Sequence, residues 1–228
     1  MKIKKINHFI KNGRKKIHFK SNITWRFKVS YIYYFNIKCS VGKTSLLNQY
    51  VKNQFIQQYK ATVGADFLTK QIRKGDNIIN LQMWDTAGSE RYHSITSGFY
   101  RNSETCILVF DLTNSSSFDN VEVWRREFLE SLNPPEGDKY PFVLIGNKND
   151  LKDIVQVKDE DIQNYCNSHN NMPYFSCSAQ NNLNVEEAFN KVADLAFERN
   201  TKNDEMPLPE IRPIQIVTEE KKKFNCCL

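Results

Sequence analysis

A phosphate-binding pattern stands at the start of the regularly patterned part of the chain. Gly42, Lys43 and Thr44 form the end of a P-loop, G-x-x-x-x-G-K-[ST], before residues 44–53, which the sequence predicts to be helical. Backbone N–H groups at a helix N-terminus bind phosphate, the lysine contacts the β- and γ-phosphates, and the threonine hydroxyl ligates Mg²⁺. Because Ile37 occupies the position of the first glycine, the tripeptide indicates phosphate binding only together with other motifs.

A second pattern, Asp85-Thr86-Ala87-Gly88, follows a predicted strand at 77–84. A carboxylate at a strand end can serve Mg²⁺ beside the P-loop hydroxyl. Gly88 offers a backbone N–H that can approach the γ-phosphate without a side chain in the way. Asp-x-x-Gly on its own is usually a turn that ends a strand.

A third pattern, Asn147-Lys148-Asn149-Asp150, follows a short apolar segment. The Asp150 carboxylate can accept hydrogen bonds from N1 and N2 of guanine, whereas adenine has no such pair of donors. Leaving the carboxylate unpaired against adenine costs on the order of several kcal/mol. Ser178-Ala179 comes after the last predicted strand, where a backbone N–H can approach the guanine O6.

The elements that must position these motifs alternate between strands and helices. Strands are predicted at 66–73, 77–84, 106–112, 142–145 and 172–178, and helices at 44–53, 118–132, 159–168 and 185–200. The continuous apolar runs in two of the strands are typical of a parallel sheet buried on both faces. This alternation predicts a three-layer α/β domain that binds ligands at the carboxyl ends of its strands.

The positive charge of the chain is concentrated at its start. Residues 1–38 hold 11 of the 32 Lys and Arg and no Asp or Glu, which leaves 21 basic residues against all 26 acidic ones. The mildly acidic remainder argues against nucleic-acid binding. The first segment lacks the uninterrupted apolar region of a signal peptide, and no apolar run of about 18 residues predicts a transmembrane helix. Alternation at 27–37 is nevertheless typical of a strand.

The six cysteines include no Cys-x-x-Cys pair, and four of them lie far apart in the sequence. This spacing argues against a zinc site and against a disulfide framework. We therefore expect a reducing, cytosolic setting.

The four motifs, in this order and each at a predicted strand end, resemble the Ras superfamily of small GTPases across residues 40–200. Within it, similarity to the Rab family lies at 62–67, 81–85, 99–101 and 108–113. Similarity to the late-endosomal and lysosomal Rab subgroup lies at 58–62, 124–129 and 171–175. The resemblance implies a P-loop small-GTPase fold, with a six-stranded, mostly parallel sheet and helices on both faces. Residues 1–39 then form a basic extension and 201–228 a flexible hypervariable tail.

The resemblance also implies roles for individual residues. Thr62 is expected to ligate Mg²⁺ with Thr44 and, through water, Asp85, while Lys43, Thr62, Gly88 and residue 89 act in GTP hydrolysis. The implied nucleotide-binding set is Ser40, Val41, Gly42, Lys43, Thr44, Ser45, Phe55, Tyr59, Thr62, Asp85, Gly88, Asn147, Lys148, Asp150, Ser178, Ala179 and Gln180. Three aromatics, Phe67, Trp84 and Phe99, are expected to contact effectors, with simple core packing as the alternative.

The chain ends in Cys226-Cys227-Leu228, which resembles the paired-cysteine ends of Rab proteins that receive two geranylgeranyl groups. Two lipids give stable anchoring where one gives only marginal binding. The residues Lys221–Lys223 add roughly 1 kcal/mol each of attraction to anionic lipid.

The implied function is that of a monomeric GTP/GDP switch in vesicular traffic to the late endosome, lysosome or vacuole. It would act on the cytosolic face of the membrane, with a cytosolic pool. The implied partners are effectors, an exchange factor, a GTPase-activating protein, a GDP-dissociation inhibitor and a prenylation escort protein.

Two positions depart from the family pattern. Ser89 stands where most Rab proteins have the glutamine that orients the attacking water, and serine is too short to do the same, so slow intrinsic hydrolysis is expected. Ile37 is β-branched where glycine permits a sharp turn. Three readings stay open: a slow GTPase switch, a GTP-dependent effector scaffold with little hydrolysis, and a chain that binds no nucleotide. Residues 1–39 are either a mispredicted or alternative first exon, or contain a substitute first strand at 29–37.

Overall fold

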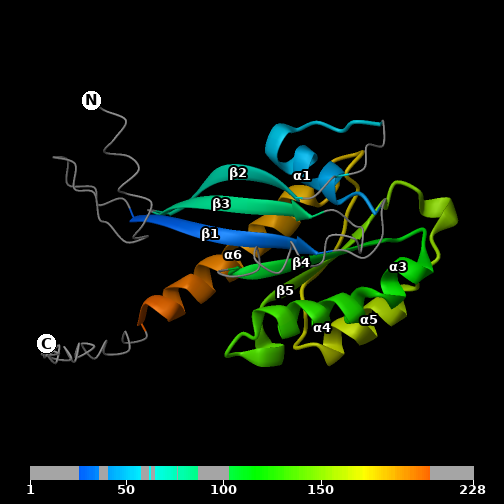
Figure 1. Ribbon diagram of the computed structural model, residues 1–228. Coiled ribbons are helices and arrows are strands. Elements are labelled where there is room, and N and C mark those ends of the chain that lie inside the picture. Colours follow the sequence, from blue (N-terminus) through cyan, green and yellow to red (C-terminus); the bar gives the residue numbers. More distant parts are fainter. Residues whose placement is uncertain are drawn as a thin grey trace, which may run out of the picture.

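The computed structural model describes residues 26–35, 41–57, 62, 65–75, 77–86 and 103–205, with backbone alone for 26–35, 65, 86 and 202–205. Six strands form one sheet in the order β2-β3-β1-β4-β5-β6 (Figure 1). They are β1 (Arg26–Phe35), β2 (Ala65–Lys74), β3 (Asn77–Thr86), β4 (Thr105–Asp111), β5 (Phe142–Asn147) and β6 (Tyr174–Ser176). Only the β2–β3 pair is antiparallel, so the expected six-stranded, mostly parallel sheet is confirmed.

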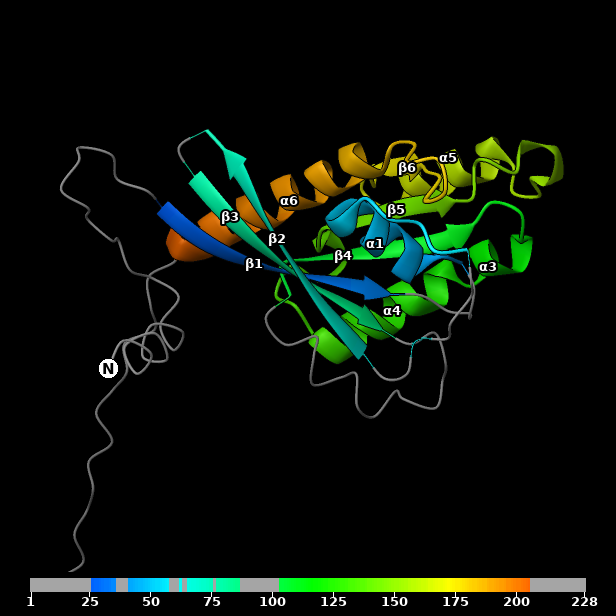
Figure 2. The ribbon, with the colours of Figure 1, turned by 90° about the horizontal axis from the view of Figure 1, so that it is seen from above.

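Helices cover both faces of this sheet (Figures 1 and 2). The α-helices are α1 (Lys43–Lys52), α3 (Ser115–Asp119), α4 (Val121–Leu132), α5 (Asp159–Ser168) and α6 (Val185–Glu205), and two 3₁₀ turns are η3 (Gly137–Lys139) and η4 (Lys152–Ile154). One core cluster joins α1 and α6 to the sheet, and the other joins α4 and α5 to the opposite face. The expected three-layer α/β fold is thereby confirmed.

Strand β4 shows why its sequence is continuously apolar. Its alternate residues Ile107 and Val109 belong to the core under α1 and α6, whereas Leu108 and Phe110 belong to the core under α4 and α5. Successive side chains of a strand point to opposite faces, and all seven residues of β4 are buried. Polar residues of such a strand are therefore tolerated mainly where it ends.

The central strand comes from the basic N-terminal segment. β1 pairs in parallel with β3 from Arg26↔Asn77 to Tyr34↔Asp85, and with β4 from Ile32↔Thr105 to Phe35↔Leu108. It lies at 26–35, slightly before the substitute first strand expected at 29–37. The expected boundary between a basic extension at 1–39 and the GTPase domain would therefore separate β1 from the sheet to which it belongs.

Most elements lie within one or two residues of the expected ranges, and three differ more clearly. The helix expected at 118–132 is divided, since Asn120 ends α3, caps α4 and donates its side-chain amide to the Ser116 carbonyl at 2.5 Å. Asparagine favours such local bonds over a helix interior. The last strand is shorter than 172–178, and α6 continues past residue 200 to Glu205.

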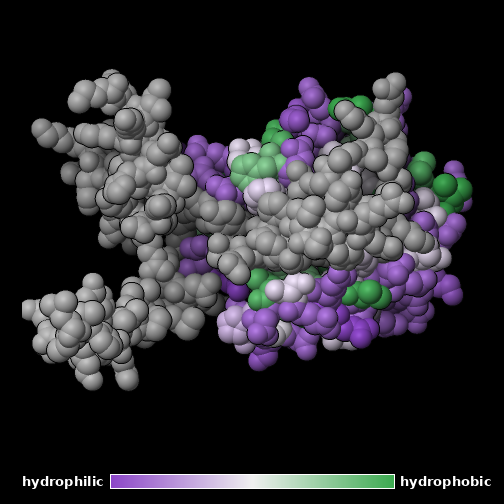
Figure 3. All heavy atoms as spheres, in the orientation of Figure 1, coloured by the Kyte–Doolittle hydropathy of each residue, from purple (hydrophilic) through white to green (hydrophobic). Residues whose placement is uncertain are grey.

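Hydrophilic residues predominate in the described part of the face shown in Figure 3, and apolar residues occur there in small groups. Among the described residues, no helix has the length and apolar character needed to cross a bilayer.

Deleting residues 1–38 should abolish folding, because it removes the central strand and leaves the edges of β3 and β4 that face it without backbone partners. Circular dichroism and thermal melting of the purified chain would measure this loss. Deletion of residues 1–21 is the matched control, since it leaves β1 whole and should melt like the parent. A cooperative transition at the parent temperature in the 1–38 deletion would show that β1 is dispensable.

Candidate functional site

Motifs that lie far apart in sequence meet at one end of the sheet. Asp85 lies near the end of β3, Asn147 ends β5, and the N-terminus of α1 lies beside them. The Thr44 hydroxyl donates to Asp85 Oδ2 at 2.5 Å, and Asn147 Nδ2 donates to the Val41 carbonyl at 2.8 Å. This is the end at which parallel α/β sheets bind ligands.

The start of α1 requires glycine. Gly42 has φ of 89°, in the left-handed region, and a Cβ there would lie 2.4 Å from Asn147 Nδ2. The Gly42 carbonyl accepts the first helical bond from Leu46 N at 2.9 Å. Gly42 offers no capping side chain and the first turn contains no acidic residue, so the first N–H groups of α1 suit an anion. The buried Lys43 ammonium adds positive charge at the same point.

The side chains of Thr44, Thr62 and Asp85 converge on one point. The two threonine hydroxyl oxygens lie 2.9 Å apart, and Thr62 Oγ1 lies 3.5 Å from Asp85 Oδ2. Asp85 is 1% exposed. Burial raises the pKa of its carboxyl, while the hydrogen bond from Thr44 and the charge of Lys43 oppose this rise.

These three residues fit a magnesium ion. Mg²⁺ prefers hard oxygen ligands such as hydroxyls and carboxylates. Asp85 Oδ1 is buried and has no hydrogen-bond partner among the described residues, so a cation would satisfy it and offset the burial of the charge. The donor set therefore matches the ion that the sequence led us to expect.

Asn147 links the P-loop to the loop after β6. Its Nδ2 donates to Val41, and its Oδ1 accepts a hydrogen bond from Ala179 N at 3.2 Å. The side chain is 2% exposed, so both bonds are shielded from water. Asn147 thus fixes the P-loop relative to the loop that follows β6.

Asp150 is oriented by the same loop. The Ser178 hydroxyl donates to Asp150 Oδ1 at 2.5 Å, and Ser178 Oγ accepts a bond from Asn181 N at 3.0 Å. Ser178 is fully buried and also forms a backbone bridge with Leu183. One oxygen of the carboxylate is therefore held by the protein, which fixes the orientation of the group.

The remaining described candidates occupy varied surroundings. Val41 is buried, Ser45 is half-buried and Gln180 is exposed. Phe55 is partly buried against the core under α1 and α6. Phe67 is 40% exposed and its ring centroid lies 4.8 Å from that of Trp84. Seven candidates lie outside the described residues: Ser40, Tyr59, Gly88, Ser89, Phe99, Cys226 and Cys227.

One residue at this end of the sheet escaped the sequence analysis. Asp111 ends β4 and forms an ion pair with Lys148, Oδ2 to Nζ, at 2.7 Å. The only indication in the sequence was an acidic residue directly after a run of buried apolar ones.

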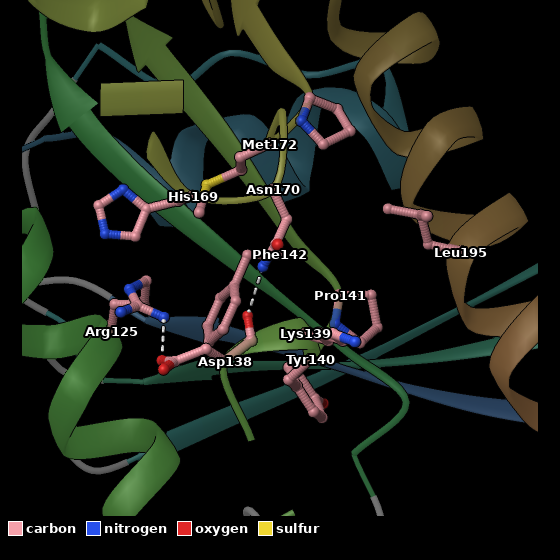
Figure 4. Close-up of a pocket in the computed structure, with 11 residues that line it drawn as sticks. Arg125, Asp138, Lys139, Tyr140, Pro141, Phe142, His169, Asn170, Met172 and Leu195 are labelled. Carbon is pink, nitrogen blue, oxygen red and sulfur yellow. Dashed lines mark hydrogen bonds and ion pairs between the residues drawn. The ribbon is translucent and has the colours of Figure 1, made fainter. Parts of the chain in front are cut away.

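A cavity of about 170 Å³ lies at the other end of β5 and is separate from these motifs. Figure 4 shows Arg125, Phe142, His169 and Met172 around it, with Arg125 Nη1 donating to Asp138 Oδ1 at 3.1 Å. Phe142 begins β5, whereas the nucleotide motif follows its last residue. The cavity therefore does not belong to the candidate site.

Comparison with known proteins identifies the family. A model of the Ras family matches residues 38–198. The chain is 43% identical over 188 residues to the Ras-related protein Rab-7a of Dictyostelium discoideum and to the Ypt/Rab-type GTPase ypt7 of Schizosaccharomyces pombe. Each alignment covers 82% of this chain and 91% of the relative. It is 49% identical over 159 residues to the Ras-related protein Rab7 of Drosophila melanogaster, covering 70% of this chain and 76% of that protein. The chain therefore belongs to the Ras family of small GTPases and, within it, to the Rab GTPases.

Proposed function

We propose that this GTPase is a Rab-type switch that binds Mg²⁺ and GTP, hydrolyses GTP slowly and recruits effectors in vesicular membrane traffic. The observation that carries the proposal is the convergence of Thr44, Thr62 and Asp85 beside the N-terminus of α1. Membership of the Rab GTPases supports the same reading.

In the proposed reaction the chain binds and orients the phosphates. The N–H groups of α1 and the Lys43 ammonium bind the β- and γ-phosphate oxygens, and burial of Lys43 keeps its charge weakly screened. Thr44, Thr62 and Asp85 would hold Mg²⁺, which would supply charge neutralisation at the phosphates. The bound γ-phosphate would then be open to in-line attack by water, with GDP as the leaving group.

The switch is proposed to act through Thr62. Its hydroxyl contacts both Thr44 and Asp85, so the segment before β2 is tied to the centre that holds the ion. Loss of the γ-phosphate would remove one reason for this segment to stay in place. Phe67 and Trp84 lie on the β2–β3 hairpin that follows, and with Phe99 they are the proposed effector contacts.

A second function is favoured by Ser89. Without glutamine at this position the intrinsic reaction lacks a group to orient water, and a chain that stays in its GTP form acts as an effector scaffold. A third outcome, failure to bind nucleotide, follows if Ile37 disrupts the first turn of the P-loop.

We propose that the chain reaches its membrane through geranylgeranyl groups on Cys226 and Cys227. The relatives in Dictyostelium and Drosophila are named Rab-7a and Rab7, which supports the late endosome, lysosome or vacuole as the site of action. The lipidated chain needs an escort for prenylation and a GDP-dissociation inhibitor for its cytosolic pool. An exchange factor and a GTPase-activating protein would drive its cycle.

Guanine selectivity tests the assignment of Asp150. The parent should bind GTP far more tightly than ATP. Asp150→Asn should weaken GTP binding by about 100-fold and improve XTP binding, because the new amide repels the donors of guanine but can donate to the xanthine O2. Equilibrium titration with fluorescent nucleotides gives the affinities.

The control for this titration is Asp153→Asn, which makes the same change three residues away. An unchanged preference for GTP in Asp150→Asn would contradict the assignment. The same titration is run on a chain that carries Ile37→Gly, Lys38→Asp and Cys39→Ser, which restores the Gly-Asp-Ser of the family pattern. If the parent binds GTP poorly because its P-loop is damaged, this repaired chain gains GTP binding. If the site is wrongly assigned, the repair changes nothing.

Ser89→Gln should raise the intrinsic rate of GTP hydrolysis at least about tenfold, because glutamine can orient the attacking water. Single-turnover phosphate release from the preloaded protein measures this rate. Ser89→Ala should hydrolyse GTP like the parent. If the glutamine variant also matches the parent, Ser89 does not limit the reaction.

Replacing both Cys226 and Cys227 by serine should move the chain from membranes to the cytosolic fraction in cells. Each single replacement should leave weak, partial membrane binding, since one lipid gives only reversible attachment. Fractionation of a fluorescently tagged chain reports the distribution. Full membrane retention by the double variant would refute lipidation at these residues.

A further inference from the structure

The ion pair between Asp111 and Lys148 connects two neighbouring strand ends. Asp111 is the last residue of β4 and is in register with Asn147, the last residue of β5. Lys148 follows directly, and its Nζ lies 2.7 Å from Asp111 Oδ2. The Asp111 side chain is 9% exposed and that of Lys148 is 31% exposed, so the carboxylate is covered while the lysine side chain remains partly open to solvent.

Asp111 is itself held in one orientation. Its Oδ1 accepts hydrogen bonds from Thr113 N at 2.9 Å and from Thr113 Oγ1 at 2.7 Å. Its backbone N–H donates to Ser117 Oγ at 2.9 Å. These bonds fix the carboxylate, and Oδ2 is left facing Lys148.

The backbone of Lys148 is equally constrained. Its φ of 69° lies in the left-handed region, which is unusual for a residue with a side chain. Leu151 N donates to the Lys148 carbonyl at 3.0 Å, and Asn149 N donates to the Cys177 carbonyl at 2.9 Å. The direction in which the side chain leaves the backbone is therefore set, whereas its four-carbon stem keeps rotational freedom that a partner must remove.

We propose that Asp111 is a positioning residue for guanine-nucleotide binding, which holds the Lys148 side chain in its binding arrangement before the nucleotide arrives. The inference rests on the proposed place of Lys148 in the nucleotide site. Pre-ordering a long side chain spares the nucleotide the entropy loss of immobilising it. Asp111 thus acts through Lys148 and needs no contact with the nucleotide.

The alternative role is purely structural, a buried ion pair that stabilises the fold. Such pairs often contribute little net stability, because desolvation offsets their attraction. A structural role predicts that Asp111→Asn lowers the melting temperature and speeds nucleotide release only as much as an equally destabilising change outside the site. A positioning role predicts that the effect of Asp111 on nucleotide release disappears once the Lys148 side chain is removed.

A double-mutant cycle separates the two roles. We expect Asp111→Asn to release fluorescent GDP about 5- to 10-fold faster than the parent, in line with losing the order of one long side chain. In the Lys148→Ala background the same change should alter the release rate by less than about twofold. Stopped-flow fluorescence measures the rates in the full chain, and thermal melting is recorded for every variant.

The matched control is Glu104→Gln. Its carboxylate is similarly buried, 13% exposed, and pairs with Arg199 rather than with a residue of the site. The Glu104→Gln substitution removes a buried negative charge, as Asp111→Asn does. It should leave the rate of GDP release unchanged even if the melting temperature falls. A Glu104→Gln release rate as fast as that of Asp111→Asn would make the effect a general consequence of lost stability and overturn the inference.

A second variant covers the case in which Asp111→Asn does not fold. Thr113→Val removes one hydroxyl bond to Asp111 and should speed release about two- to threefold, with Thr113→Ser restoring the parent rate. Release at the parent rate in Asp111→Asn, or in Thr113→Val where Asp111→Asn does not fold, overturns the inference while the proposed function stands. A parent chain that does not retain GDP overturns both.

Discussion

The side chain of Asn147 joins segments of the chain that are distant in sequence. One amide supplies a donor to the P-loop at Val41 and an acceptor to the loop at Ala179, inside a space closed to water. An unpaired amide there would be costly, so both loops are held where they satisfy it. The close approach of Gly42 to the same amide leaves room for no side chain at that position. The relative position of these two loops of the candidate site therefore depends on one residue.

A second constraint concerns charge. The site concentrates buried or half-buried ionic groups, Lys43, Asp85, Asp111 and Lys148, at the edge of an apolar sheet. Asp111 and Lys148 neutralise each other at 2.7 Å. Among the described residues Asp85 has no such ion pair, and burial raises the pKa of its carboxyl in spite of Lys43 and Thr44. Burial disfavours the ionised form of this carboxyl, so binding of the proposed cation and ionisation of Asp85 would be coupled.

Much of this arrangement could be predicted from the sequence. Continuous apolar runs identified β4 and β5, and the polar motifs directly after strands identified the end of the sheet where Thr44, Asp85 and Asn147 meet. The reason is that a strand buried on both faces places its functional groups at its ends. The periodicity of apolar residues predicted the helices and strands, and the spacing of the motifs predicted where the candidate site lies.

The features that escaped prediction depend on tertiary contacts. The break between α3 and α4 follows from a side-chain bond of Asn120 that competes with the helix, and the apolar stripe crosses this break unchanged. The position of β1 is set by its pairing with β3 and β4, which alternation within 27–37 could not specify. Asp111 acquires its role only from the register between β4 and β5, which no single segment encodes.

The placement of β1 has a consequence for the order in which the chain can fold during synthesis. Of the described strands β1 leaves the ribosome first, yet its two neighbours are residues 77–86 and 105–111. Until both have emerged, a strand destined for the middle of the sheet has both edges free. Parallel pairing of segments so distant in sequence is slow and exposes strand edges that promote aggregation. The lysines and arginines concentrated in residues 1–38 would repel other nascent copies of the same segment during this interval.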